Sequence, residues 1–344
     1  GRRNLIINGA MQVAQRGTST SVGTDSGGYS PDRFRLGTAA TTAGDIKQVT
    51  TVPSGSGFGK SLQIDVTTAD STLAAGDAIL LNYKFEGQDL QGLKKGSSSA
   101  ESLTLSFWVR SPKTGTHIAE LYDNDNTRHL SKAYIIDTAD TWEYKTITYA
   151  GDTSGALDND NNTSITLNFW LGAGTTYSSG TLQSSWGTPT NANRAAGQVN
   201  VFDNTANNFY ITGVQLEVGS VATPFEHRSY GEELSLCKRY YEKSYIQGIG
   251  PGASPNVYSG AIFFTMAANT HYEEIRYEVE KRATPTVVLY ASNDGSTGKW
   301  YSHADTSQKT AIVDHGNSAR GVRVAVTGTA GHRMDGHFSA DAEL

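Results

Sequence analysis

The stretches SLTLSFWVRS (102–111) and SITLNFWLGA (164–173) repeat one pattern of residue types. In an extended chain, alternate side chains point to opposite faces. The opposite face from the apolar one carries Ser, Thr or Asn and a single tryptophan, Trp108 or Trp170. The alternation predicts two β-strands that each bury one face in a core. The residues predicted to be buried are Leu103, Leu105, Phe107 and Val109 in the first stretch, and Ile165, Leu167, Phe169 and Leu171 in the second.

Similar short alternating runs recur along the chain, separated by loops rich in Gly, Ser, Thr, Asn and Asp. Charged residues make up 18% of the 344 residues and hydrophobic residues 37%, which is not the profile of a disordered chain. We therefore predict an all-β protein with a jelly-roll β-sandwich of about ten strands over residues 1–225. A short helical connector over 226–248 and a smaller C-terminal β-sandwich over 249–344 are expected to follow.

Composition also argues against nucleic-acid binding, a disulfide framework and membrane insertion. The net charge of −6, without a cluster of Lys and Arg, argues against nucleic acid. The single cysteine, Cys237, rules out an intrachain disulfide framework. The longest apolar run, AIFFTMAA (261–268), is too short to span a bilayer, and no signal-peptide core is apparent. We expect no membrane insertion.

Tryptophans are the sharpest candidates for a binding site. Trp108 and Trp170 would lie on polar sheet faces, where aromatic rings can stack on sugar rings. The alternative is that they fill a core or lie beneath a covering loop, because tryptophan is usually largely buried. Trp142, next to Tyr144, is expected to be structural.

Trp186 lies in a long polar loop, SSGTLQSSWGTPTNANRAAG (178–197). There it either serves an interface or acts as a hydrophobic plug that holds the loop down. Tyr177 and Arg194 lie in or next to the same loop. The predicted carbohydrate-binding residues are Trp108, Trp170, Trp186, Tyr177 and Arg194.

Two acidic loops, DNDN (123–126) and DNDNN (158–162), offer oxygen ligands that suit Ca²⁺. Their spacing lacks the Gly and terminal Glu of a helix-loop-helix site, and tight turns use the same residues without metal. Both interpretations stay open. The candidate Ca²⁺ ligands are Asp123, Asn124 and Asp125, and no other cofactor is predicted.

Catalytic motifs are absent from the sequence. The eight histidines are scattered, with neither an H-E-x-x-H pattern nor a G-x-S-x-G elbow. No pair of carboxylates stands out for glycoside hydrolysis. We expect a protein that is not an enzyme.

Several phrases together resemble a family of bacteriophage virion proteins, tail-fibre-like or other particle-surface proteins. They occur in the family's order over nearly the whole chain. The resemblance implies a structural protein of the virion, assembled in the host cytoplasm and in contact with other virion proteins. The phrases are NLIINGAMQVAQRGTS, YSPDRFRL, SLQIDVTTADS, FEGQDLQGL, ESLTLSFWVRS, AELYDNDNTRHLSKAY, DTWEYKTITYAGDTSG, ITGVQLEVGSVATPFEHRSYGEELSLCKRYYEKSY and FSADAEL.

Residues 1–225 also resemble the jelly-roll carbohydrate-binding modules attached to polysaccharide-degrading enzymes. The similar segments are the opening NGAMQ, the strands LTLSFWVR and TWEYKTITY, and the closing FYITGVQLE. Such modules commonly hold a structural Ca²⁺ through acidic residues in the opening and closing strands. This chain departs from that pattern, with Gln12 and Thr212-Gly213 at those places.

A fibre-type protein without disulfides can gain stability by burying surface between chains, so we expect a homotrimer. One helix of three to four turns is predicted over GEELSLCKRYYEKSY (231–245). Its residues Leu234, Tyr240 and Tyr241 would then be apolar on more than one helix face and suit a subunit contact. The alternative is a helix that packs only on its own two sandwiches.

Three functions follow in order of preference. The first is a virion surface protein, such as a tail fibre, that displays β-sandwiches towards a polysaccharide of the host cell surface. The second is a purely structural head-fibre, decoration or tail-assembly component without a ligand. The third is a polysaccharide depolymerase.

Overall fold

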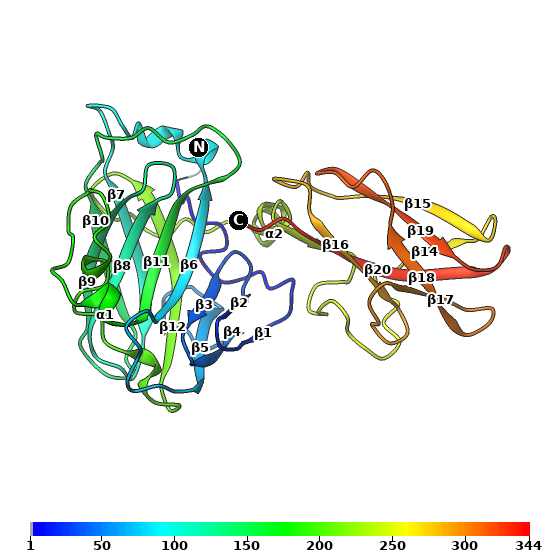
Figure 1. Ribbon diagram of the computed structural model, residues 1–344, viewed down its shortest axis with the longest axis horizontal. Helices are drawn as coiled ribbons and strands as arrows, with labels where there is room; N and C mark the ends of the chain where they lie inside the picture. The colour runs from blue at the N-terminus through cyan, green and yellow to red at the C-terminus, as the bar shows by residue number, and fades with distance from the viewer. Residues whose placement is uncertain (1–2) are drawn as a thin grey trace. The chain divides into compact units, whose positions relative to one another are not determined.

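The computed structural model describes residues 3–344, and β-strands dominate them (Figure 1). The chain divides into two compact units. The first unit contains residues 3–12, 18–229 and Leu344, and the second contains residues 13–17 and 230–343. The all-β prediction is confirmed.

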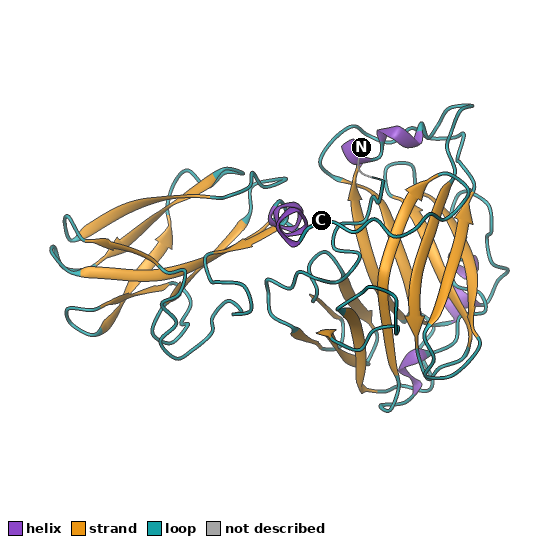
Figure 2. Cartoon of the chain, turned by 180° about the vertical axis from the view of Figure 1, so that it is seen from behind, coloured by secondary structure: helices purple, strands orange, loops and turns teal. Residues whose placement is uncertain are grey.

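The first unit is a sandwich of two six-stranded antiparallel sheets (Figure 2). The β7 sheet has the strand order β1-β4-β5-β12-β7-β10, and the β11 sheet has the order β2-β3-β6-β11-β8-β9. The β7 sheet contains β1 (Ser19–Val22), β4 (Ala43–Val49), β5 (Ser61–Thr68), β12 (Asn208–Val218), β7 (Leu103–Arg110) and β10 (Glu143–Tyr149). The β11 sheet contains β2 (Ser26–Tyr29), β3 (Arg35–Ala39), β6 (Ala78–Glu86), β11 (Thr163–Ala173), β8 (Gly115–Asp123) and β9 (Arg128–Ile136).

The two repeated stretches form β7 and β11, which lie in opposite sheets. Their predicted inner faces are buried, with Leu103 the most exposed of the eight residues at 4%. The equivalent residues Phe107 and Phe169 meet across the core, with ring centroids 5.1 Å apart and planes nearly perpendicular. The apolar faces of the two repeated stretches therefore pack against each other from opposite sheets and fill one core.

Some elements of the first unit differ from the sequence prediction. Strands β1 and β2 lie in GTSTSVGTDSGG (17–28), a stretch whose Gly, Ser and Thr content predicts a loop, and the sequence pattern does not predict β9. The run NLIING (4–9), which the sequence pattern predicts to be a strand, is irregular. Short helical turns connect strands at Gly87–Asp89, Gln91–Leu93, Thr175–Ser178 (α1), Asn191–Asn193 and Val201–Asp203.

The second unit is built around β20 (Arg333–Asp341), with which four other strands pair. Its core is apolar and includes Trp300, Val324, Met334 and Phe338. The other elements are α2 (Tyr230–Lys238), β13 (Tyr241–Lys243), β14 (Ile262–Thr265), β15 (Thr270–Arg276), β16 (Thr286–Ala291), β17 (Lys299–Ser302), β18 (Ser307–Val313) and β19 (Gly321–Thr327).

The predicted helix over 231–245 is wrong in its second half, because α2 ends at Lys238. Tyr241 begins β13 and pairs with Asp341 of β20. Tyr240 and Tyr241 are 1% and 4% exposed within this chain, which contradicts their prediction as subunit contacts. Leu234 is half-buried on α2. The alternation of this segment suited a strand as well as a helix, and pairing with β20 decided it.

A histidine lies in the core of the first unit. His117 on β8 is fully buried and stacks on Tyr134, with ring centroids 5.5 Å apart. Its Nε2 lies 3.0 Å from the carbonyl oxygen of Lys113, whereas its Nδ1 has no hydrogen-bond partner among residues 3–344. Burial lowers the pKa of His117 from 6.5 to about 4. The folded protein therefore keeps this imidazole neutral in mildly acidic solution.

We expect His117 to make the first unit less stable as the pH falls from 6.5 to about 4. In that window the unfolded chain binds a proton on His117 and the folded chain does not, so acid favours unfolding, by about 3 kcal/mol in total. Urea unfolding at a series of pH values checks this. The variant His117→Phe should lose this part of the pH dependence, and an unchanged slope in that window would contradict the assignment.

Candidate functional site

Trp108 lies on the outer face of the β7 sheet and lines a pocket of about 380 Å³, named here the Trp108 pocket. On the neighbouring strands, Trp108 is paired with Tyr144 of β10 and Thr212 of β12. The rings of Trp108 and Tyr144 have centroids 5.4 Å apart, and Tyr144 is 46% exposed. The pocket is lined by Ser56, Phe58, Ser106, Trp108, Tyr144, Gly213, Pro224, Phe225 and His227.

The opposite wall of the pocket consists of three rings from two loops. The ring centroid of Phe58 lies 5.0 Å from that of Phe225 and 5.4 Å from that of His227. Gly213 of β12 lets Phe58 lie against the strand, because a Cβ atom there would lie 2.5 Å from a carbon of the Phe58 ring. Gly213 also has a left-handed φ of +61°, at an irregularity in the pairing of β12 with β7.

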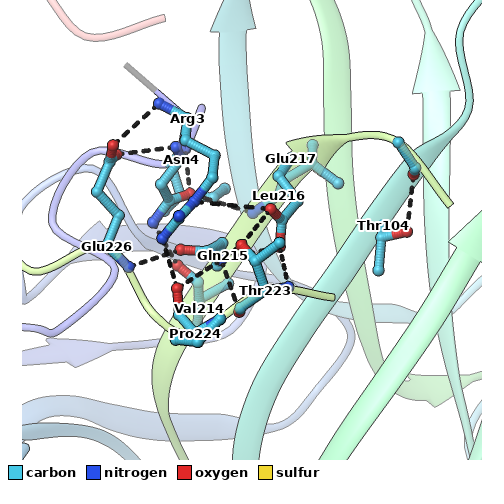
Figure 3. A network of polar contacts seen from close by, with 12 residues as sticks. Arg3, Asn4, Thr104, Val214, Gln215, Leu216, Glu217, Thr223, Pro224 and Glu226 are labelled. Carbon is cyan, nitrogen blue, oxygen red and sulfur yellow. Dashed lines mark hydrogen bonds and ion pairs between the residues drawn. The ribbon is translucent and has the colours of Figure 1, made fainter. Parts of the chain in front are cut away.

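A polar network fixes the segment that carries Phe225 and His227 (Figure 3). Glu217 of β12 accepts hydrogen bonds from the amide and the hydroxyl of Thr223, at 2.9 and 2.6 Å. Gln215 accepts one from the amide of Glu226 at 2.8 Å. Gln215 and Glu217 are almost fully buried, so the acceptor side chains of these bonds are shielded from solvent.

Glu226 ties the same segment to the start of the described chain (Figure 3). Its carboxylate accepts hydrogen bonds from the amides of Arg3 and Asn4, at 3.0 and 2.9 Å, and from Arg228 at 2.9 Å. Burial raises the pKa of Glu226, but these donors outweigh burial and hold it below the usual range. The wall of the Trp108 pocket is therefore preformed, and a ligand would lose little binding energy in ordering it.

Trp170 is buried whereas Trp108 is partly exposed, although both occupy the same position in the repeated stretches. It is 1% exposed, and its indole N–H donates to Glu120 at 3.2 Å. The loop of residues 174–198, named here the covering loop, brings Tyr177 and Arg194 against its ring, at 5.4 Å in each case. The structure brings three predicted sugar-binding residues together, but Trp170 is buried beneath the other two, which stay partly exposed. The alternative interpretation, a tryptophan beneath a covering loop, is confirmed for Trp170.

Glu120 anchors the covering loop. It is fully buried on β8 and accepts hydrogen bonds from Arg194, through Nε at 2.7 Å and Nη2 at 2.9 Å. His129 and Asn168 contact the same carboxylate at 3.0 Å each. Burial raises the pKa of Glu120, but the hydrogen bonds from His129 and Arg194 lower it to below its usual value. Glu120 is therefore a buried anion held by the loop.

Trp186 in the covering loop is half-buried. Its indole N–H donates to the carbonyl oxygen of Ala150 at 2.8 Å, and the ammonium of Lys95 lies 5.4 Å from its ring centre. The adjacent Gly187 pairs with His129 of β9. These contacts favour the interpretation of Trp186 as a plug.

The three candidate Ca²⁺ ligands do not converge. Asp123 is fully buried and pairs with Lys95 at 2.5 Å. Asn124 donates to the hydroxyl of Thr166 on β11, and Asp125 accepts from the amide of Asp158 in the loop before that strand. In residues 3–344, no group of three or more His, Cys, Asp or Glu is placed to hold a metal ion. Lys95 Nζ also contacts Asp152 and the carbonyl oxygens of Ser154 and Gly155, at 3.1, 3.0 and 2.8 Å. An ammonium thus sits among oxygen atoms of the kind that Ca²⁺ prefers.

Of the residues that line the Trp108 pocket, sequence reasoning predicted only Trp108, and it missed the four other side chains with aromatic rings: Phe58, Tyr144, Phe225 and His227. Tyr144 lies on the outer face of β10, two residues after Trp142, and this alternation of aromatic residues was the available signal. The other three lie outside any strand, where no periodicity could have found them.

None of the helices in the described chain is long and apolar enough to cross a membrane.

No protein-family model matches the chain, and no curated protein sequence matches it. The solved structures that are similar to part of it include the following three. The enzymatically active domain of tailspike protein 4 from bacteriophage CBA120 is 14% identical, with a TM-score of 0.33 over 62% of this chain and 21% of its own. TmCBM61 in complex with beta-1,4-galactotriose is 12% identical, with a TM-score of 0.32 over 63% of this chain and 99% of its own. A xylan-binding domain from CBM 22 is 10% identical, with a TM-score of 0.31 over 64% of this chain and 98% of its own.

This chain thus spans only about a fifth of the tailspike chain, at 21% of its length. At these identities and TM-scores, the likenesses carry no argument about function. The fold class rests on the two sheets of the first unit and the β20-centred sheet of the second.

Proposed function

We propose that this chain is a non-enzymatic surface protein of a bacteriophage particle and that its first unit binds a host-surface saccharide in the Trp108 pocket. The observation that carries the binding proposal is the open pair of rings formed by Trp108 and Tyr144. The apolar face of a sugar ring can pack on such rings, while its hydroxyl groups bond to polar neighbours. His227, Ser56 and Ser106 supply polar groups around the same pocket.

The position on a virion is supported by the sequence resemblance described above. Binding at one shallow site of this kind would be weak, and a homotrimer would present three copies and gain avidity. Attachment to other virion proteins is part of the same proposal.

A purely structural role is the second candidate, and one observation favours it. Val218 and Val221, which lie between Glu217 and Thr223 in the sequence, are 44% and 73% exposed. Exposed aliphatic residues of this kind would also suit a protein neighbour. A depolymerase ranks third, and release of reducing sugar from host polysaccharide would test it.

Replacing Trp108 by alanine is expected to weaken saccharide binding by about tenfold or more, because the stacking surface is lost. The fold should persist, since the side chain lies on an outer sheet face and is only half-buried. A glycan array on the purified protein selects the saccharide, and calorimetry on the variant measures the loss.

Trp142→Ala is the matched control, because Trp142 lies on the same sheet face, packs on Tyr210 and does not line the pocket. It should bind as the unmodified protein does. Equal binding by Trp108→Ala would overturn the site. Absence of any glycan binding by the unmodified protein would favour the structural role.

A further inference from the structure

The outer face of the β11 sheet is only partly covered. The covering loop packs on β11 and β8, against Trp170 and Glu120. At the other end of the sheet, β2, β3 and β6 leave a second pocket of about 350 Å³, named here the Arg35 pocket. It is lined by Asp25, Ser26, Gly27, Arg35, Gly37, Thr38, Ala39, Ala78, Leu80 and Asn82.

Arg35 is unusual among the arginines of the first unit. Of those in the described residues, it alone has neither a hydrogen bond nor an ion pair to its guanidinium. Arg194 binds Glu120, Arg128 binds Asp152, and Arg110 binds Asp140. The remaining ones, Arg3, Arg33 and Arg228, also donate to protein oxygens. An unpaired guanidinium lining a concave pocket is free to bind an anion.

Two glycines make room for this guanidinium. A Cβ atom at Gly27 would lie 1.9 Å from Nη2 of Arg35, and one at Gly37 would lie 2.7 Å from Nη1. The side chain therefore lies close to the backbone of β2 and β3, in a position that a larger residue at either glycine would block.

Asn82 is the cross-strand neighbour of Arg35. Its side-chain amide also has no hydrogen-bond partner within residues 3–344. Leu80 and Ala78, on the same strand, give the pocket an apolar side. The pocket therefore offers a fork of donors for a planar carboxylate, an amide for a hydroxyl group, and an apolar surface for the face of a sugar ring.

We propose that the Arg35 pocket binds an acidic sugar residue, with Arg35 gripping the carboxylate and Asn82 an adjacent hydroxyl group. The carboxylate of Asp25 lines the same pocket and disfavours a doubly charged group such as a phosphate monoester. This site lies on the sheet opposite the Trp108 pocket, and its occupancy does not depend on saccharide binding there.

The test is an NMR titration of the whole chain with D-galacturonate, D-galactose and D-galactose 6-phosphate. Galacturonate should shift the backbone amide signals of β2, β3 and β6, and the other two sugars should bind about tenfold more weakly or worse. Arg35→Met should lose about tenfold or more in affinity for galacturonate, and Arg35→Lys should lose less because it keeps the charge.

Two further variants test whether binding depends on the position of the Arg35 guanidinium or only on the net charge of the protein. Gly27→Ala keeps the charge but displaces the guanidinium, so it should also bind weakly. Lys132→Met removes one positive charge from β9, at the opposite edge of the same sheet, and should bind as the unmodified chain does. Trp108→Ala should retain galacturonate binding, which separates this result from the outcome at the Trp108 pocket. Equal binding of galactose and galacturonate, or unchanged binding by Arg35→Met, would overturn the proposal.

Discussion

Replacing Lys95 by methionine is expected to destabilise the first unit by about 3–5 kcal/mol, the usual effect of breaking a buried ion pair. The ammonium of Lys95 lies 2.5 Å from Asp123 and 3.1 Å from Asp152, and all three side chains are less than 5% exposed. Asp152 keeps Arg128 as a second partner, at 2.7 Å. Asp123 would keep only the hydrogen bonds from Asn126 and would be left as a buried carboxylate without a cation in direct contact.

Lys94→Met is a closely matched control. Lys94 precedes Lys95 and pairs with Glu101 at 2.7 Å, but the two side chains are 55% and 39% exposed. Water solvates both partners, so the loss should stay within about 1 kcal/mol. Urea unfolding of both variants measures the difference. Equal loss in the two would show that Lys95 is not the internal cation described here.

Replacing Arg194 by methionine is the second large effect expected, again about 3–5 kcal/mol. It removes the guanidinium that neutralises the fully buried Glu120. Because this contact anchors the covering loop, the loop should also open and expose Trp170. Hydrogen exchange should then accelerate at the amides of Gln183 and Ala195, which donate to backbone oxygens of Asn193 and Tyr177.

A second substitution makes the Arg194 result specific. Glu120→Gln removes the stranded charge, so the double variant should recover part of the stability lost by Arg194→Met alone. Arg110→Met is the control for loss of an exposed pair, since Asp140 is 53% exposed and can be solvated. Simple additivity of Arg194→Met and Glu120→Gln would contradict the proposed coupling.

The inner faces of the first unit could be predicted because burial in a sandwich follows strict alternation. Phe107 and Phe169 illustrate this, since each was assigned to the core from its neighbours alone. The outer faces could not be predicted in the same way. Trp108 and Trp170 have nearly the same local sequence, yet Arg194 covers only Trp170, through a contact with Glu120 that is 74 residues away in the chain.

The Trp108 pocket and the ion pairs of Lys95 also depend on contacts between distant residues, which the sequence pattern does not predict. Phe58 and Phe225 come from loops and reach the pocket through Gly213 and the buried pair Gln215 and Glu217. The acidic loop at Asp123 suggested a metal ion because its ligand chemistry is that of a cation site. The cation is a lysine that comes from a distant turn, and sequence spacing cannot reveal such a partner.

The central claim, saccharide binding in the Trp108 pocket, is tested most directly by the indole N–H signals of the five tryptophans. On titration with the saccharide that the array selects, the signal of Trp108 should shift. The signals of Trp170 and Trp300, which are 1% and 0% exposed, should stay in place. A bound saccharide that leaves the Trp108 signal unmoved, or that moves Trp170 in its place, would contradict the account.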